Sequence, residues 1–228
     1  MNFSLETIER LEREYFKRFG GSSTKQQQSL ADRIRRSLSW IKRSVHISTE
    51  DAPRRFVDLW IALNSLYGSP LSHRGETEQE TFKIFLEILG KDRDCRERLN
   101  LLLEDRRVKD LTKTIVQNKY LWPQFWSKNP NYRTAITNEW EKMEQAQNKG
   151  DISRFLLGLF ERLNILRNQI FHGASSAATI RNKDSVDPGI EILEILLSCF
   201  LGLMVRFSPE NHWPPLPFPG RGSPQHPE

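Results

Sequence analysis

The residues best suited to chemistry lie between positions 164 and 173, where an apolar stretch carries an arginine, two asparagines and a histidine before a glycine. Asn164, Asn168 and His172 are spaced by four residues, so on a helix each step turns by only about 40° and the three form one polar stripe. Arg167 lies about 140° from His172 on a straight helix. Its long side chain must therefore curl towards the helix end to act together with the histidine.

These residue types can cleave a phosphodiester when the substrate supplies its own nucleophile, as RNA does with its 2′-hydroxyl. The imidazole of His172 can take or give a proton near neutral pH. Arg167 can neutralise charge that develops on the phosphate, and Asn168 can orient the histidine or bind a phosphate oxygen. No carboxylates, histidines or cysteines at ligand spacing accompany them, so we expect neither a metal nor a cofactor.

The same residues also fit a purely structural interpretation. His172 can end a helix with its imidazole on the last carbonyls and Gly173 in the left-handed cap conformation, while Arg167 forms an ordinary ion pair. Considered without any relative, the residues favour this helix-end interpretation.

The whole chain has 228 residues and a net charge of +5, and the part outside 164–173 reads as a helical scaffold. Two cysteines, Cys95 and Cys199, are too few for a disulfide framework or a thiolate zinc site. The longest uncharged apolar stretch, 195–205, is shorter than the roughly 20 residues that span a bilayer, and the charged segment 1–20 is unlike a signal peptide. We therefore expect a cytoplasmic protein with no membrane span.

Helical periodicity predicts an all-α bundle with no strands. A single domain is expected over 51–219, with the helices of 1–50 either part of it or appended to it, and a disordered tail at 220–228. A proline-rich segment, 213–219, either packs over the domain or binds a proline-recognising module. The predicted helices cover 3–19, 25–43, 51–67, 77–89, 92–103, 109–120, 134–149, 151–171 and 190–207, with polar loops at 127–133 and 174–188.

Three further features are candidate RNA contacts. Asn64 has apolar neighbours three, four and seven residues before it, which predicts a buried amide bonded either to the backbone or to a ligand. The aromatic cluster 121–126 could stack bases, although a packing corner is the favoured interpretation. The helix 25–43 has a single acid, Asp32, and carries a positive excess as large as that of the whole protein, so its basic face is the first candidate for an anion. Its basic residues are Lys25, Arg33, Arg35, Arg36, Lys42 and Arg43, of which Arg35, Arg36, Lys42 and Arg43 are predicted to contact RNA.

The segment 167–172 (RNQIFH) matches the R-x4-6-H motif of the HEPN superfamily, including a polar residue directly after the arginine. The wider segment 162–173 resembles the form found in the ApeA-like HEPN group. That group is also similar to this chain at 56–67 (FVDLWIALNSLY), at 118–126 (NKYLWPQFW) and in the tail at 213–219. The resemblance therefore covers roughly residues 54–219 in order, which is far more than a chance match of the short motif.

This resemblance implies a helical bundle that forms a homodimer, so that two Arg–His motifs face each other in one cleft. HEPN proteins with an intact motif are commonly metal-independent endoribonucleases in toxin–antitoxin systems, phage defence or RNA processing. The implied partners are therefore RNA and an antitoxin or defence-system protein. Carried over residue by residue, Arg167 and His172 are catalytic, Asn168 assists them, and Asn64 is a further contact. Asn164, on the same polar stripe as Asn168 and His172, is also predicted to contact RNA.

Two hypotheses follow for the function. The first is a dimeric, metal-independent ribonuclease that uses Arg167, Asn168 and His172. The second is a non-catalytic RNA-binding or protein-interaction module on the same scaffold, since other HEPN domains act in that way. Ala174 stands where some HEPN toxins carry a tyrosine that a partner nucleotidyltransferase modifies, so this chain lacks that target.

Overall fold

The structure, a computed structural model, describes residues 4–20, 25–68, 77–172 and 180–207, together with Trp213 and Leu216. Every regular element within these residues is a helix, so the all-α prediction is confirmed. The more specific HEPN-like bundle stays a prediction. The elements are α1 (Leu5–Phe19), α2 (Lys25–Val45), η1 (Thr49–Asp51), α3 (Ala52–Tyr67), α4 (Glu78–Lys91), α5 (Arg93–Glu104), α6 (Arg106–Gln117), η3 (Lys119–Leu121), α7 (Pro123–Trp126), α8 (Tyr132–Asn148), α9 (Ile152–Phe171) and α10 (Ile180–Arg206).

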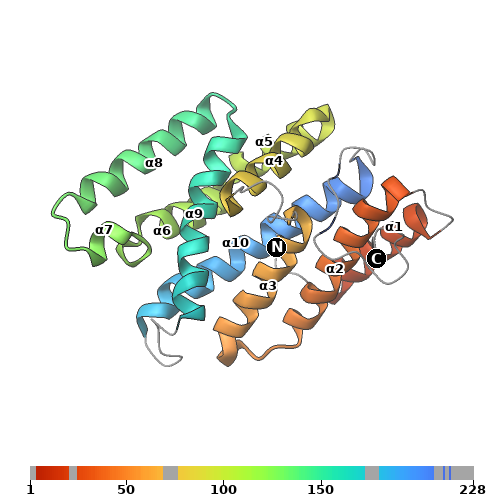
Figure 1. The fold of residues 1–228 in the computed structure, drawn as a ribbon, viewed down its shortest axis with the longest axis horizontal. Coiled ribbons are helices and arrows are strands. Elements are labelled where there is room, and N and C mark those ends of the chain that lie inside the picture. Colours follow the sequence, from red (N-terminus) through yellow and green to blue (C-terminus); the bar gives the residue numbers. More distant parts are fainter. Residues whose placement is uncertain are drawn as a thin grey trace, which may run out of the picture.

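Helix α10 is the element around which the others are arranged. It packs against α3, α6 and α1, with smaller contacts to α2, α5 and α9. Figure 1 shows α10 crossing the middle of the molecule, with α1, α2 and α3 side by side on one flank and the helices from α4 to α9 on the other. The buried side chains of both flanks form one continuous hydrophobic core.

An aromatic cluster in this core fixes α9 against its neighbours. The ring of Phe160 in α9 stacks on Phe82 of α4 at 4.2 Å between centroids and on Trp60 of α3 at 5.3 Å. Phe200 of α10 meets Phe85 of α4 edge-on at 5.2 Å. Such pairs contribute about 0.5–1.5 kcal/mol each beyond the burial of their area. The position of α9 relative to α3 and α4 is thereby set two turns before its polar end.

Side-chain caps place most helix starts close to the predicted positions. Thr77 forms a capping box with Glu80 at the start of α4, and Asp151 accepts the backbone N–H of Arg154 at the start of α9. Among the boundaries that differ from prediction are the end of α4 and the start of α6. Gly90 lies inside α4 rather than ending it, and α6 begins at Arg106 instead of residue 109 because Asp105 caps it.

The predicted loop over 174–188 is wrong from residue 180 onward, because α10 begins at Ile180 and includes Pro188. Burial explains the difference: Ser185 and Val186 are only 3% and 1% exposed. The amide of Asn118 also donates to the Ser185 hydroxyl at 2.6 Å. A proline inside a helix removes one backbone hydrogen bond, and tertiary packing offsets that loss here. Residues 173–179, which include Gly173 and Ala174, lie outside the described residues.

The apolar part of α10 is longer than 195–205, the longest uncharged apolar stretch in the sequence. In the described part of the chain, one segment, Asp184–Arg206, is long and apolar enough to cross a bilayer by length and composition alone. However, 67% of its most apolar window is buried inside this fold. That pattern is typical of a core helix.

Candidate active site at the end of helix α9

Helix α9 runs out of the core at its C-terminal end. Leu163 and Leu166 are buried, whereas Arg167 and Asn168 are half-buried and the final residue, Phe171, is 57% exposed. The same helix that carries Phe160 into the aromatic core therefore presents a polar last turn to its surroundings.

The side chain of Arg167 turns towards α3 and α4. Its Nη2 donates to Glu78 Oε2 at 2.8 Å, and its Nη1 donates to Asn168 Oδ1 at 2.8 Å. The guanidinium lies 5.6 Å from the ring of Trp60 and 5.8 Å from that of Phe171. Arg167 and Asn168, which the sequence proposes as functional partners, are thus joined directly, and the arginine is held in one orientation.

Glu78 is the member of this cluster that the sequence analysis missed. It is the first residue of α4, where the helix dipole favours a carboxylate. Its Oε1 accepts a hydrogen bond from the hydroxyl of Tyr67 at 2.9 Å. Burial raises the pKa of Tyr67 well above its usual value, and the charge of Glu78 adds to this effect. The network Tyr67–Glu78–Arg167–Asn168 therefore links the ends of α3 and α9 to the start of α4.

His172 follows α9 directly as its C-cap residue. Its backbone N–H donates to the carbonyl oxygen of Asn168 at 2.9 Å, and its side chain is exposed. Within the described residues, no hydrogen bond joins the imidazole to the last carbonyls of the helix, as the helix-end interpretation requires. No hydrogen bond joins the imidazole to the Arg167 guanidinium there either. The His172 side chain is therefore exposed one turn after Asn168 and, among the described residues, makes no hydrogen bond to the arginine–asparagine pair.

Several buried polar atoms on this face lack a hydrogen-bond partner among the described residues. They are the side-chain atoms Trp60 Nε1, Asn164 Oδ1 and Arg167 Nε. Asn164 lies one turn after Phe160, whose ring stacks on Trp60. Unpaired buried polar groups are uncommon and costly, and they mark places where a ligand, ion or water can be bound. Asn164 Oδ1 is therefore an acceptor that a ligand could use, and its role as an RNA contact stays a prediction.

Asn64 differs from expectation because its side chain is exposed rather than buried. Its backbone carbonyl accepts the N–H of Gly68 at 2.7 Å, which closes the last turn of α3. The amide is therefore free to meet solvent or a ligand, and the inference from its apolar neighbours along the helix was wrong.

Arg33 is not part of a basic surface, contrary to the sequence interpretation. It is completely buried and donates to the carbonyl oxygens of Leu66 at 2.8 Å and Gly68 at 2.7 Å. Burial lowers the pKa of its guanidinium to about 10. Arg33 instead ties α2 to the end of α3.

The other proposed RNA-binding residues of α2, Arg35, Arg36, Lys42 and Arg43, carry less free charge than their number suggests. Arg35, Lys42 and Arg43 each have a carboxylate partner, and the partner of Arg43, Asp58, is buried. These pairs weaken α2 as the first candidate for an anion surface, because a phosphate would have to compete with each carboxylate. The pairs are Arg35 with Asp32 at 3.1 Å, Lys42 with Glu12 at 3.2 Å and Arg43 with Asp58 at 2.7 Å.

The aromatic cluster 121–126 divides into two parts. Leu121 and Trp122 are buried, and Trp122 Nε1 donates to the carbonyl oxygen of Val116 at 2.7 Å, as a packing corner requires. Trp126, however, is 57% exposed.

In the proline-rich tail, Trp213 and Leu216 are 8% and 9% exposed, so these two residues pack on the domain. The remaining tail residues lie outside the described part.

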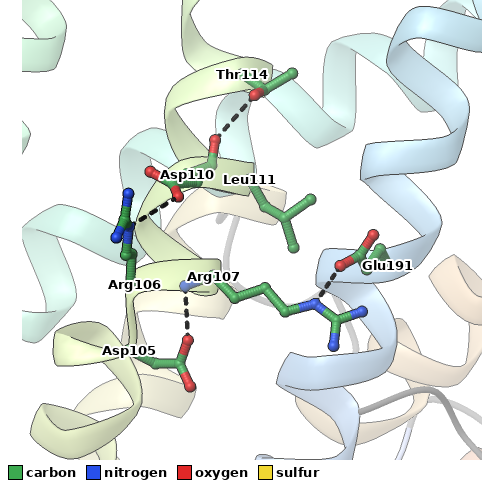
Figure 2. Close-up of a pocket in the computed structure, with 7 residues that line it drawn as sticks. All are labelled: Asp105, Arg106, Arg107, Asp110, Leu111, Thr114 and Glu191. Carbon is green, nitrogen blue, oxygen red and sulfur yellow. Dashed lines mark hydrogen bonds and ion pairs between the residues drawn. The ribbon is translucent and has the colours of Figure 1, made fainter.

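A separate surface hollow of about 650 Å³ lies between α6 and α10 (Figure 2). Its charged groups satisfy one another: Arg107 donates to Glu191, Arg106 pairs with Asp110 at 3.7 Å, and Asp105 caps α6. Because its charged side chains are already paired with one another, they are less available to bind a ligand than the polar groups at the end of α9. Within the described residues, no group of three or more His, Cys, Asp or Glu is placed to hold a metal ion.

Comparison of the chain with protein-family models, curated proteins and solved structures gives no significant match. The resemblance to HEPN proteins therefore rests on the sequence segments quoted above, and membership of that superfamily stays a prediction.

Proposed function

We propose that this chain is a metal-independent endoribonuclease of the HEPN type, which acts as a homodimer and is restrained by an antitoxin or defence-system partner. The observation that carries the proposal is the end of α9, where Arg167 is held against Asn168 at 2.8 Å and the exposed His172 follows in the next turn. Cleavage that uses the 2′-hydroxyl of RNA needs a group that transfers protons and a cation that stabilises the charge on the phosphate, and an accessible imidazole and a fixed guanidinium can supply these two functions.

In the proposed reaction, the imidazole of His172 takes the proton of the 2′-hydroxyl. The 2′-oxygen attacks the phosphorus, the bond between phosphorus and the 5′-oxygen breaks, and a 2′,3′-cyclic phosphate forms. A protonated imidazole returns a proton to the leaving 5′-oxygen. The two proton transfers call for two imidazoles in opposite protonation states, and His172 of the partner subunit would supply the second.

Arg167 supports this role without leaving its observed position. A guanidinium has five N–H bonds, and the contacts to Glu78 and Asn168 use only two of them. Because Nε is buried, the second N–H groups of Nη1 and Nη2 are the donors that can stabilise the charge on the phosphate while Glu78 keeps the arginine in place. The exposed ring of Phe171 beside His172 is an apolar surface that a second subunit would cover.

The test is cleavage of a single-stranded RNA in the presence of EDTA. We expect products that end in a 2′,3′-cyclic phosphate and no cleavage of a DNA of the same sequence. His172→Ala should abolish cleavage and leave the melting temperature unchanged, because the exposed imidazole makes no bond that supports the described fold. Cleavage that survives this substitution would reject the proposal.

The second candidate is a non-catalytic RNA-binding module. The observation that favours it is the ion pair between Arg167 and Glu78, which neutralises part of the charge that a catalytic arginine offers. This alternative predicts salt-dependent RNA binding without any cleavage by the wild-type protein. The same experiment separates the two functions.

A further inference from the structure

The segment 111–138, which covers the end of α6, η3, α7 and the start of α8, contains no aspartate or glutamate. It does contain four cations, Lys113, Lys119, Lys128 and Arg133. Acids and bases are nearly balanced elsewhere, since the whole chain has 34 Lys and Arg against 29 Asp and Glu. A run of 28 residues with charge of one sign is therefore a local concentration of positive charge.

Four aromatic rings gather on the same segment. Phe125 meets Tyr120, Trp126 and Tyr132 edge-on, with centroid distances of 5.3, 5.3 and 5.4 Å. Trp126 is 57% exposed, and the other three are half-buried. The buried neighbour Trp122 explains why this segment folds as a corner, but burial does not explain why a tryptophan four residues later faces outward.

The cations lie among these rings. The Lys119 ammonium is 5.1 Å from the ring centroid of Tyr120 and 5.2 Å from that of Phe125. The Arg133 guanidinium is 5.7 Å from the ring of Tyr132, and its Nε donates to the Tyr132 hydroxyl at 3.0 Å. Aromatic faces interleaved with basic groups are the pattern by which proteins hold single-stranded nucleic acid: the rings stack on bases and the cations meet phosphates.

Lys128 adds an independent observation. Its φ is 55°, the only positive φ of a non-glycine residue in the described chain, in the turn that follows α7. Glycine is the residue favoured in this left-handed conformation, and a lysine there is strained. The chain thus keeps a cation beside the aromatic rings at a position where glycine would make a more stable turn.

The acids that border this segment are already paired with arginines outside it. These pairs reduce the competition that the two flanking carboxylates would offer to a phosphate bound at the cations of the segment. Asp110, directly before the segment, pairs with Arg106 at 3.7 Å, and Glu139, directly after it, pairs with Arg154 at 2.8 Å.

A hydrogen bond connects this surface to the candidate active site. Gln169, which lies between Arg167 and His172 on α9, donates from Nε2 to the carbonyl oxygen of Tyr120 at 2.6 Å. The same carbonyl oxygen accepts the indole N–H of Trp126 at 2.9 Å. The aromatic surface is therefore continuous with the last turns of α9.

We propose that the aromatic–basic surface, defined as Lys119, Tyr120, Phe125, Trp126, Lys128, Tyr132 and Arg133, binds single-stranded RNA and leads it to the end of α9. Bases stack on Trp126, while Lys119, Lys128 and Arg133 contact phosphates. This inference deepens the proposed nuclease function and rests on it for the identity of the ligand. It also accounts for substrate class, because bases paired in a duplex are not free to stack on protein rings.

The experiment measures binding of a labelled 12-nucleotide oligouridine by fluorescence anisotropy, with every protein carrying His172→Ala so that the RNA stays intact. Trp126→Ala should weaken binding at least fivefold, since stacking on one aromatic ring is worth roughly 5- to 150-fold in affinity. Leu101→Ala, which removes an apolar side chain that is 65% exposed on α5, is the matched control and should bind as well as the parent. A duplex of the same length should bind more weakly than the single strand.

Lys128→Gly separates a functional effect from a folding defect. Relief of the left-handed strain should raise the melting temperature by about 2–4 °C. Loss of one phosphate contact should nevertheless weaken RNA binding and lower the slope of log affinity against log salt by about 0.7. A variant that becomes more stable and binds worse cannot be explained by damage to the fold.

The outcomes distinguish this inference from the proposed function. If Trp126→Ala and Lys128→Gly bind oligouridine as tightly as the parent, the surface is not the RNA site, whether or not the wild-type protein cleaves RNA. If both variants bind less tightly but the wild-type protein never cleaves, the surface stands and the nuclease proposal fails. If the parent protein does not bind RNA at all, a protein ligand becomes the better occupant of the rings and this inference is overturned.

Discussion

Replacing Glu78 with glutamine tests whether the carboxylate beside Arg167 positions that arginine for catalysis. The carboxylate accepts from Arg167 Nη2 at 2.8 Å and from the Tyr67 hydroxyl at 2.9 Å. Glutamine keeps the size of the side chain and can still bond to both groups, so the substitution removes mainly the negative charge. The arginine is then held by a neutral hydrogen bond instead of a charge-assisted one.

The expected cost to stability is modest. A hydrogen bond to a charged group contributes about 1.5–3 kcal/mol in a favourable setting, whereas an exposed ion pair contributes about 0–1 kcal/mol. The Arg167 and Glu78 side chains are 26% and 23% exposed, so this pair lies between the two cases. We expect Glu78→Gln to lower the free energy of unfolding by about 1 kcal/mol and the melting temperature by about 2–4 °C.

The kinetic constants should distinguish a role of Glu78 in positioning Arg167 from a purely structural role in folding. Less precise placement of Arg167 should lower kcat by about tenfold, which corresponds to about 1.4 kcal/mol of transition-state stabilisation. Removal of a negative charge beside the RNA phosphate should at the same time lower KM. A defect in folding alone would reduce the amount of active protein and leave KM unchanged.

The assay is steady-state cleavage of a fluorogenic RNA in EDTA. Glu80→Gln is the matched control, because Glu80 lies in the same turn of α4 but, among the described residues, bonds to Thr77 alone, and glutamine can replace glutamate in a capping box. It should leave kcat and KM unchanged. If Glu78→Gln cleaves with the kcat and KM of the wild-type protein, Glu78 does not position the arginine and the reasoning fails.

Other predictions concern the stability of the scaffold and use chemical denaturation. Gly189→Ala should lower the free energy of unfolding by about 1–3 kcal/mol, because the added Cβ would lie 2.9 Å from Phe56 Cε2 in the core. Gly202→Ala, in the same helix with no atom within 4 Å of the added carbon, should instead raise it by up to about 1 kcal/mol. Burial raises the pKa of the Cys95 and Cys199 thiols from 9.0 to about 12, so the unfolded chain releases these protons first and stability should fall as pH rises from 9 towards 12. Replacing both cysteines with alanine should flatten that decline between pH 9 and 10, and an equally steep decline would contradict the assignment.

Local sequence signals were sufficient for the helix that carries the candidate site. Asp151 followed by a run of apolar residues at three- and four-residue steps predicted α9 with both ends in place, because capping and periodicity are encoded within a few residues. The same signals failed at α10, where Pro188 and Gly189 read as a break. The packing of Val186 and Ser185, which decides that segment, depends on residues far away in the chain.

Charges were the features that sequence reasoning placed least well. In the sequence, Arg33 cannot be told apart from the surface cations of the same helix. It is buried because its guanidinium donates to the carbonyl oxygens at the end of α3. Glu78 lies 89 residues before Arg167, so no local pattern could identify it as the partner of the arginine. Both cases depend on a tertiary contact between helices that a single sequence does not specify.

The catalytic role of His172 is tested by the rates at which three proteins cleave one single-stranded RNA in EDTA. They are the wild type, His172→Ala and His46→Ala, which removes another exposed imidazole at the end of α2. We predict that the wild type and His46→Ala cleave at the same rate and leave cyclic phosphate ends, and that His172→Ala cleaves at least a hundredfold more slowly, as expected when a general acid–base group is removed. Equal rates for the wild type and His172→Ala would contradict this role.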